Sequence, residues 1–230
     1  EGQLRERYGE KINDVENCKF IVLPGMPHAE LLRWARKMNS DLIVLGPHTK
    51  EYSERRSKMW GMAGSTLERV SQRAKCPVMI VSRPRPVEEH KFLNIIAATD
   101  FSDPAECAVN YGGQMARHYK SRLTVFHCLT GGMTNEEAVD RLKEDYEPRV
   151  RGIENVEYEV RAGTPAMEIL KIAREREADL IIMAHHSKET DPEKAFLGST
   201  VTQVALNSVC PTMSVNKHFD LRCGMMYDQT

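Results

Sequence analysis

The feature that most constrains this chain is a pattern of strand, loop, helix and strand that occurs twice. An aliphatic run at 179–184 precedes a polar loop, a helix and a last strand at 212–215. A run at 41–46 is followed, in the same order, by a loop, a helix and a strand at 78–81. Two such copies are not expected by chance, so the sequence predicts a tandem repeat.

The second copy alternates strand-like and helix-like segments along its whole length. Its strands are expected at 92–98, 123–128, 156–160, 179–184 and 212–215. Such alternation predicts a parallel sheet with helices on both faces. We therefore expect a complete α/β domain with a doubly wound five-stranded sheet.

The first copy is shorter than the second. Gly25 and Gly163 are 138 positions apart, and so are Asp41 and Asp179. A counterpart of the strand at 92–98 would fall before residue 1, so the first copy lacks two strands and a helix. Its remaining strands are expected at 19–23, 41–45 and 78–81. Three explanations stay open: the chain is a fragment, another source supplies the missing half, or the half was lost.

Composition suggests where the domains meet. Residues 83–91 are rich in proline and charge and poor in apolar side chains, which is typical of a linker. We expect a truncated domain at 1–82, a complete domain at 92–216 and a tail at 217–230.

The overall charge and hydropathy argue against several classes of partner. The formal net charge of -1 provides no electrostatic basis for binding nucleic acid or an anionic membrane. No apolar run approaches the ~20 residues of a membrane helix. The first residues are charged rather than signal-like. We therefore expect a cytoplasmic protein.

The cysteines show no spacing typical of a metal or redox site. None of the six forms a CxxC pair, and several lie in or beside strand-like runs. We interpret them as reduced, small, buried side chains.

A phosphate site is suggested at the start of the last helix of each copy. Gly198 permits a close approach of backbone to a ligand, and Ser199 and Thr200 begin the helix. The free amides and the positive dipole end of a helix N-terminus suit a phosphate. Gly64 and Ser65 are weaker candidates in the first copy.

Several short segments together resemble the universal stress protein family. In the second copy they lie at 98–102, 163–165, 168–169, 179–183, 198–200 and 209–211. In the first copy they lie at 25–27, 41–46, 64–65 and 76–78. Each segment is weak alone, but the set, in this order and twice, is specific and covers nearly the whole chain.

The resemblance implies the adenine nucleotide α-hydrolase-like fold, with strand order 3-2-1-4-5. Members divide into proteins that bind ATP and proteins that do not, usually form dimers, and act in stress adaptation rather than as well-defined enzymes. Binders carry two glycines in the loop before the helix. This chain has Ala184 and Ser187 at those positions in the second copy, and Gly46 and Thr49 in the first. A side chain in place of such a glycine adds strain or closes space, so the phosphate loop is degenerate.

The implied strand order brings polar side chains to one crevice, at the carboxyl ends of the central strands. Asp100 matches the aspartate that the family places near adenine and ribose, after Ala98 and Thr99. His127, His185 and Ser187 are expected around the same crevice. Asp100 has a simpler interpretation as a loop carboxylate that binds nearby amides. Ser199 has one as a helix cap.

Two catalytic or metal alternatives are weaker. His127, His185 and His186 could converge on zinc, but no carboxylate or cysteine motif accompanies them, and we expect no metal site. Ser102 and Ser199 lie where helix capping is the ordinary role, so we expect no nucleophilic triad.

Two functional hypotheses remain. The first is a stress-response protein that binds an adenine nucleotide, ATP with Mg²⁺, in the second domain and acts by association rather than catalysis, with weak ATP hydrolysis left open. The second is an interaction module that no longer binds nucleotide and pairs through its last strand, as a homodimer or between its own domains. Both exclude nucleic acid and membrane partners.

Overall fold

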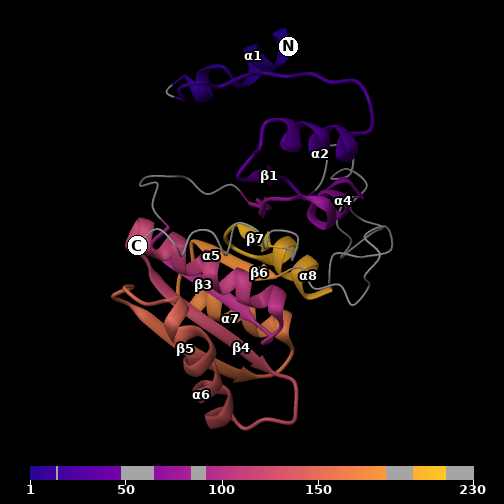
Figure 1. Ribbon diagram of the computed structural model, residues 1–230. Coiled ribbons are helices and arrows are strands. Elements are labelled where there is room, and N and C mark those ends of the chain that lie inside the picture. The colour runs from indigo at the N-terminus through magenta and orange to yellow at the C-terminus, as the bar shows by residue number, and fades with distance from the viewer. Residues whose placement is uncertain (14, 48–64, 84–91, 185–198, 216–230) are drawn as a thin grey trace.

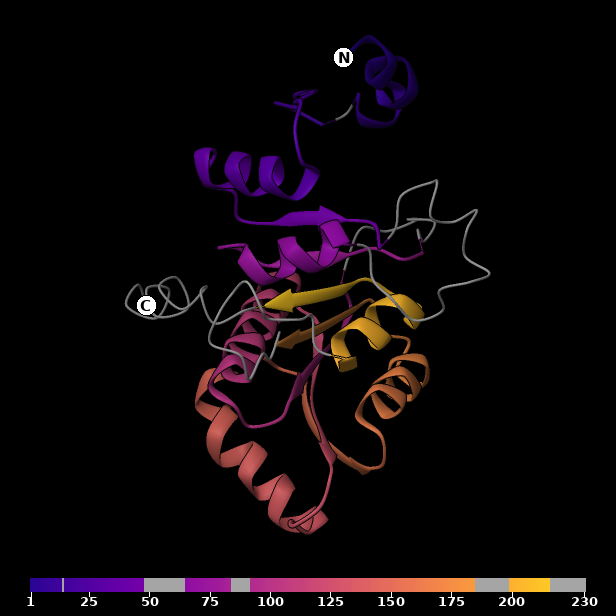
Figure 2. The same ribbon diagram turned by 90° about the vertical axis from the view of Figure 1, so that its right-hand side faces the viewer.

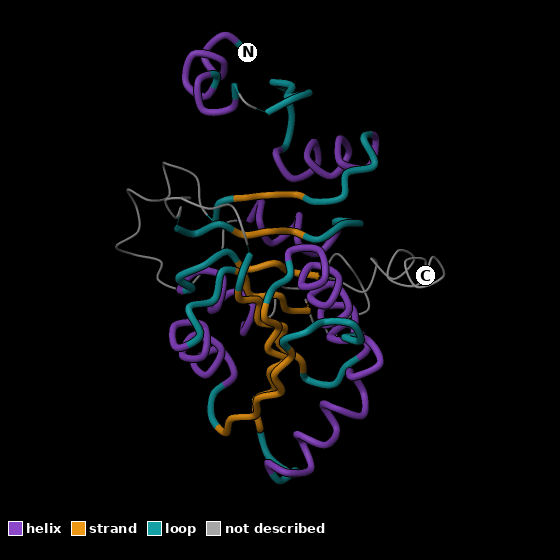
Figure 3. Tube along the Cα trace, turned by 90° about the vertical axis from the view of Figure 1, so that its left-hand side faces the viewer, coloured by secondary structure: helices purple, strands orange, loops and turns teal. Residues whose placement is uncertain are grey.

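The computed structural model describes residues 1–13, 15–47, 65–83, 92–184 and 199–215. Its centre is a sheet of seven strands with helices on both sides (Figures 1 and 3). In spatial order the strands are β1 (Ile43–Leu45), β2 (Val78–Ile80), β7 (Thr212–Val215), β6 (Leu180–Ala184), β3 (Asn94–Thr99), β4 (Arg122–Leu129) and β5 (Val156–Ala162). Both copies of the repeat therefore contribute to one sheet.

The second copy has the predicted topology. Its strands β3 to β7 are all parallel to their neighbours within the copy. Counted from its own first strand, their order is 3-2-1-4-5, which confirms the expected doubly wound fold. The strand β3 lies at the centre of this copy's strands, and four of its six residues have buried aliphatic side chains.

Helices cover both faces of this part of the sheet (Figure 2). On one face lie α5 (Asp103–Tyr119) and α6 (Asn135–Tyr146), which the short helix η2 (Glu147–Arg149) follows. On the other lie α7 (Pro165–Glu175) and α8 (Ser199–Asn207). A capping box between Thr134 and Glu137 begins α6.

The middle of α5 lies very close to the sheet because it contains glycine. A Cβ atom at Gly112 would lie 3.2 Å from the Cβ of Ala97 and 3.6 Å from Cδ1 of Ile182. Glycine in a helix interior costs about 1 kcal/mol relative to alanine. Here that cost is offset by close contact between the helix and two central strands.

The first copy consists of fewer elements. They are α1 (Gly2–Tyr8), η1 (Glu10–Ile12), α2 (Pro27–Lys37), β1, α4 (Ser65–Arg73) and β2. The strands β1 and β2 are parallel, and α2 packs against α4. The helix α1 lies apart from the sheet (Figures 1 and 2).

The two copies join through their last strands. The strand β2 pairs antiparallel with β7, and Met79 lies opposite Met213. Since β6 holds the other side of β7, both edges of the last strand are occupied within the chain. Of the pairings expected for this strand, the structure shows the one between the chain's own domains.

The strand expected at 19–23 is wrong, because the structure has no strand there. Its counterpart in the second copy is β5, which β4 holds by hydrogen bonds along its length. No described residue of the first copy occupies the place of β4. The segment therefore lacks a neighbour to pair with, and its Val22 is 58% exposed.

The cysteine expectation is correct for four of the five described residues. None of the five described cysteines forms a disulfide, and Cys76, Cys107, Cys128 and Cys210 are buried, whereas Cys18 is exposed. Cys18 belongs to the segment before α2 that has no strand partner, so its expected burial is wrong. Among the described helices, none has the length and apolar character that a membrane span requires. The domain boundaries stay a prediction, since 84–91 and 216–230 lie outside the described residues.

Candidate functional site

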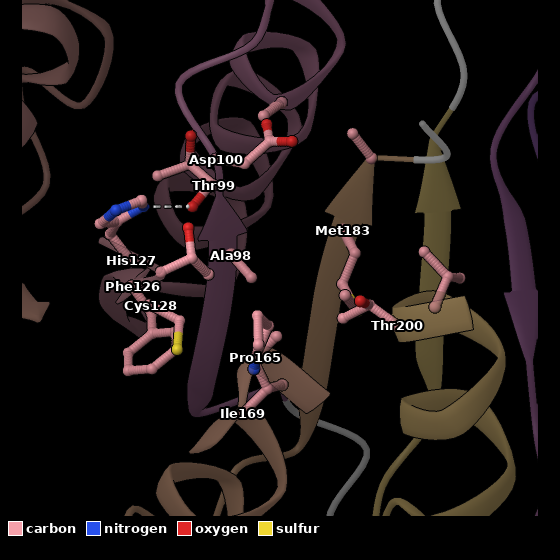
Figure 4. A pocket seen from close by; sticks show the side chains of 14 residues that line it. Ala98, Thr99, Asp100, Phe126, His127, Cys128, Pro165, Ile169, Met183 and Thr200 are labelled. Carbon is pink, nitrogen blue, oxygen red and sulfur yellow. Dashed lines mark hydrogen bonds between the residues drawn. The ribbon is translucent and has the colours of Figure 1, made fainter. Parts of the chain in front are cut away.

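A cavity of about 610 Å³ lies at the carboxyl ends of β3, β4 and β6, beside the first turns of α7 and α8 (Figure 4). Parallel sheets bind ligands at this end, next to the central strand. It is lined by Ala98, Thr99, Asp100, Ala105, Phe126, His127, Cys128, Thr130, Pro165, Ile169, Met183, Ala184, Thr200 and Val201. The volume lies within the range of about 300–1,000 Å³ typical of small-molecule sites.

The end of β3 forms the acidic side of the cavity. Asp100 is exposed, and its Oδ1 accepts a hydrogen bond of 3.1 Å from the amide of Ser102. This local turn holds the carboxylate at the mouth, directly before α5 begins. The carboxylate therefore serves as the loop carboxylate that the sequence allowed, and it also lines the cavity.

The two chain neighbours of Asp100, Thr99 and Phe101, belong to a cluster of hydroxyl and aromatic groups. The hydroxyls of Thr99 and Tyr146 share a hydrogen bond of 2.6 Å, and the Thr99 hydroxyl accepts the amide of Phe101 at 3.0 Å. Phe101 has φ 62°, a left-handed conformation unusual for an aromatic residue. The centre of its ring lies 4.4 Å from the centre of the His127 ring. The guanidinium carbon of Arg141 lies 4.2 Å from the centre of the same Phe101 ring.

A hydrogen bond to a backbone carbonyl fixes the tautomer of His127. Its Nδ1 lies 2.9 Å from the carbonyl oxygen of Thr99, which only accepts, so Nδ1 carries the proton (Figure 4). In the neutral ring Nε2 is then an acceptor. The ring lies against Phe101, on the face of the sheet opposite to Phe126 and Cys128. The carboxylate of Asp100 on this side of the cavity favours a ligand that carries hydrogen-bond donors, such as ribose hydroxyls.

The opposite wall comes from β6 and the start of α8. Met183 and Ala184 end β6, and Thr200 and Val201 belong to the first turn of α8. A helix start has unpaired amides and the positive end of the helix dipole. The cavity therefore lies between a carboxylate and a position that suits an anion.

The floor of the cavity is apolar. It includes Phe126, Ile169 and the thiol of Cys128, which donates to the carbonyl of Gly163 at 3.4 Å. Burial raises the pKa of the Cys128 thiol, and the carboxylate of Glu168 raises it further. The thiol is therefore neutral at neutral pH and contributes surface rather than nucleophilic reactivity.

The described site residues that the sequence predicted for the second copy lie together. Ala98, Thr99, Asp100, His127, Ala184 and Thr200 all line the cavity, and Ser199 is the first residue of α8. The predicted His185, Ser187 and Gly198 lie outside the described residues, as does His186.

Sequence reasoning missed the floor. Phe126 and Cys128 lie two positions apart on β4, so their side chains point to one face, while His127 points to the other. The signal was this alternation, which separates the polar residue of the strand end from the two apolar ones. Pro165 and Ile169 add the start of α7.

Ala184 does not carry the backbone strain that its replacement of a glycine suggests. It is the last residue of β6 and pairs with Val215 in the sheet, and its φ is not positive. Only space distinguishes it from glycine at this position, because its methyl group adds to the cavity wall.

The first copy has parts of the same arrangement. Gly46 directly follows β1, and Ser65 is the first residue of α4, while Gly64 lies outside the described residues. Among the described residues no strand lies beside β1 at the place of β3. The described residues of the first copy therefore include no carboxylate that corresponds to Asp100.

The described part of the chain contains no group of three or more His, Cys, Asp or Glu side chains able to hold a metal ion. Of the three histidines considered for zinc, only His127 is described.

Comparisons with known proteins agree with this fold. A model of the universal stress protein family matches residues 1–82 and 91–216. Universal stress protein MJ0531 of Methanocaldococcus jannaschii is 35% identical over 83 residues, which span 36% of this chain and 42% of that protein. This chain therefore matches less than half the length of that relative.

Solved structures that superimpose on nearly the whole chain include the following two. A universal stress protein from Archaeoglobus fulgidus superimposes with a TM-score of 0.69 at 22% identity, over 94% of this chain and 78% of the other. The functionally unknown protein PA1789 from Pseudomonas aeruginosa superimposes with a TM-score of 0.60 at 13% identity, over 99% and 82%. At these identities the likeness shows the fold alone. Together with the family match over both copies, it establishes that the chain is a tandem member of the universal stress protein family.

Proposed function

We propose that this chain acts in a stress response by binding an adenine nucleotide, ATP with Mg²⁺, in the cavity of its second copy. Binding would change its shape or its association with partners, and catalysis would have no part. The proposal depends above all on one observation: the cavity is open, with Asp100 at one side and the first turn of α8 at the other. Had side chains filled this space, no nucleotide could enter.

The chemistry of the walls fits the parts of the ligand. The carboxylate of Asp100 suits the hydroxyl donors of ribose, and the apolar floor suits a base. The first turn of α8 suits the phosphates. Mg²⁺ would bind between phosphate oxygens and water, because it prefers oxygen ligands and keeps much of its hydration.

Thermal unfolding with and without ATP and Mg²⁺ tests the proposal. A ligand at 100 times its Kd stabilises the folded state by about 2.7 kcal/mol, which would raise Tm measurably. An unchanged Tm at millimolar ATP would count against binding. A phosphate-release assay in the same samples should show no turnover.

A matched pair of variants assigns the effect to the cavity. Asp100→Asn keeps the oxygen that binds Ser102 but removes the charge, and we expect ATP affinity to fall about tenfold, as for a lost charged hydrogen bond. Asp103→Asn removes a carboxylate three residues away in the first turn of α5, outside the cavity lining, and should leave the affinity unchanged. Equal losses in the two variants would contradict binding at this cavity.

A further inference from the structure

The turn after β3 contains a backbone conformation that aromatic residues rarely adopt. Phe101 has φ 62°, in the left-handed region where the Cβ atom crowds the backbone. Phe101 precedes a helix, since α5 begins two residues later. The other described non-glycine residues with positive φ are asparagines or follow a helix, where left-handed residues are common: Asn17, Asn39, Lys120 and Glu177. The conformation of Phe101 therefore needs a cause in its own contacts.

The ring of Phe101 is held by side chains from two elements. Its centre lies 4.4 Å from the centre of the His127 ring, near the end of β4. It is stacked on the ring of Tyr146, the last residue of α6, with 6.3 Å between the centres and 9° between the planes. The guanidinium carbon of Arg141 lies 4.2 Å from the ring centre, within the range of a cation–π interaction. These contacts bury part of the ring and oppose the strain of the left-handed backbone.

The backbone on the other side of Asp100 is fixed as well. The carbonyl oxygen of Thr99 accepts a hydrogen bond of 2.9 Å from Nδ1 of His127. The hydroxyl of Thr99 accepts the amide of Phe101 at 3.0 Å and shares a hydrogen bond of 2.6 Å with the hydroxyl of Tyr146. Both chain neighbours of Asp100 are therefore attached to β4 and α6, whereas Asp100 itself is exposed.

The ring of Phe101 lies outside the cavity that Asp100 lines. Neither Phe101 nor its partners Tyr146 and Arg141 belong to the cavity lining. Any effect of the ring on a ligand must therefore pass through the backbone that it shares with Asp100.

We propose that Phe101 is a positioning residue for ligand binding. Its ring, held by β4 and α6, fixes the turn from which Asp100 presents its carboxylate to the ligand. The inference rests on the proposed function, in which that carboxylate accepts hydrogen bonds from ribose hydroxyls. A carboxylate on a mobile turn would have to be ordered at each binding event, which costs conformational entropy and weakens the contact. Discrimination between ribose and a sugar without hydroxyls then depends on a ring outside the cavity.

A simpler role for the ring is to stabilise the start of α5 as part of the core. Loss of the ring would then lower Tm without changing which sugar is preferred. Two measurements separate the roles. One is the ratio of the Kd for 2′,3′-dideoxyATP, which lacks both ribose hydroxyls, to the Kd for ATP. The other is the order parameter of the Asp100 amide in the protein without nucleotide, from nuclear magnetic resonance relaxation.

Replacement of the ring by glycine is the main test. Glycine adopts positive φ without steric cost, so in Phe101→Gly the turn stays accessible but is no longer held. The order parameter of the Asp100 amide should fall from about 0.85, typical of rigid backbone, to below about 0.6. The Kd ratio should fall from about tenfold in the parent chain, as for a lost charged hydrogen bond, to about twofold. Phe101→Tyr keeps the ring and should keep both values.

A matched pair on α6 tests the contact that holds the ring. Arg141→Gln removes the cation over Phe101 and should lower both quantities in part. In a chain that already carries Phe101→Gly it should have no further effect, because the two residues act through one contact. Lys143→Gln removes a cation two residues away, outside the cavity lining, and should change neither quantity. The side chain of Arg141 is 45% exposed, so Arg141→Gln keeps the test in place if the glycine variant does not fold.

The outcomes that overturn the inference are distinct from failure of the proposed function. An order parameter and a Kd ratio that stay at the parent values in folded Phe101→Gly would overturn it, and so would equal losses in Arg141→Gln and Lys143→Gln. A parent chain that does not bind ATP would contradict the proposed function. The order parameter would then decide by itself whether the ring fixes Asp100.

Discussion

The strands β1 and β6 carry the same sequence pattern at the same place in two copies of one fold, yet only β6 lies in the core, where four of its five residues are buried. The residues Ile181 and Ile182 have no exposed surface, while their counterparts Ile43 and Val44 are 8% and 56% exposed. A strand's own residues thus predict that it forms. Its neighbours, β3 and α5 in one copy and neither among the described residues of the other, decide whether it lies in a core.

The helices α6 and α1, which occupy corresponding places in the two copies, also differ in burial. Tyr146 at the end of α6 is 3% exposed and binds Thr99, whereas Tyr8 at the end of α1 is 41% exposed. The turns before α2 and α7, in contrast, are nearly the same in both copies. Gly25 and Gly163 have φ 130° and 149°, and each lies against the glutamate one turn into its helix. Local structure is therefore shared, and tertiary environment is not.

The largest expected difference is between Ile182→Ala and Val44→Ala. The first removes buried methyl groups beneath α5 and should lower the free energy of unfolding by about 2–5 kcal/mol. The second acts at an exposed position and should change it by less than about 0.5 kcal/mol. Urea unfolding followed by circular dichroism measures both. Equal losses would mean that Val44 is covered in solution.

The second largest effect is expected at the glycine that both copies have before a helix, Gly163 before α7 and Gly25 before α2. Alanine at Gly163 would place a Cβ 3.0 Å from Cγ of Glu168, and at Gly25 one 3.1 Å from Cγ of Glu30, both at positive φ. Such strain costs about 1–3 kcal/mol. Amide exchange in α7 and in α2 should therefore accelerate to a similar degree in the two variants. An effect confined to Gly163→Ala would show that the first turn depends on its missing neighbours.

A smaller loss is expected for Tyr146→Phe. It removes one of the two hydrogen-bond partners of the buried Thr99 hydroxyl and should cost about 1 kcal/mol. Tyr8→Phe is the matched control, since this ring is exposed, and should have no measurable effect on the urea midpoint. A Tyr146→Phe protein as stable as the parent would indicate that the hydrogen bond between Thr99 and Tyr146 contributes nothing net.

The smallest effect depends on pH. Burial raises the pKa of Tyr146 above its ordinary value of about 10, in spite of the opposing hydrogen bond from Thr99. The folded state therefore holds this proton more tightly than the unfolded state, so its stabilising contribution is complete below about pH 10 and declines as pH rises further. Stability measured from pH 9 to 11 should fall less steeply in Tyr146→Phe than in Tyr8→Phe. Parallel curves for the two variants would exclude this contribution.

Much of the candidate site was predictable, because strand ends in a parallel sheet meet at one edge. Applied to the strand order that the family resemblance implies, that rule predicted that Ala98, Thr99, Asp100, His127 and Ala184 lie near each other. The floor from Phe126, Cys128 and Ile169 was not predicted, since apolar residues at a strand end are ordinary core residues until a cavity is found beside them. The hydrogen bond from His127 to the Thr99 carbonyl also depends on two strands lying side by side.

By itself the sequence determined the repeat and the alternation of strands and helices, because these depend on residues close together in the chain. Only the tertiary structure decided that both copies share one sheet, that 19–23 is not a strand and that β1 is left half exposed. Those outcomes depend on backbone groups finding partners far away in the chain. A strand sequence cannot form a strand alone, since its hydrogen bonds belong to its neighbours.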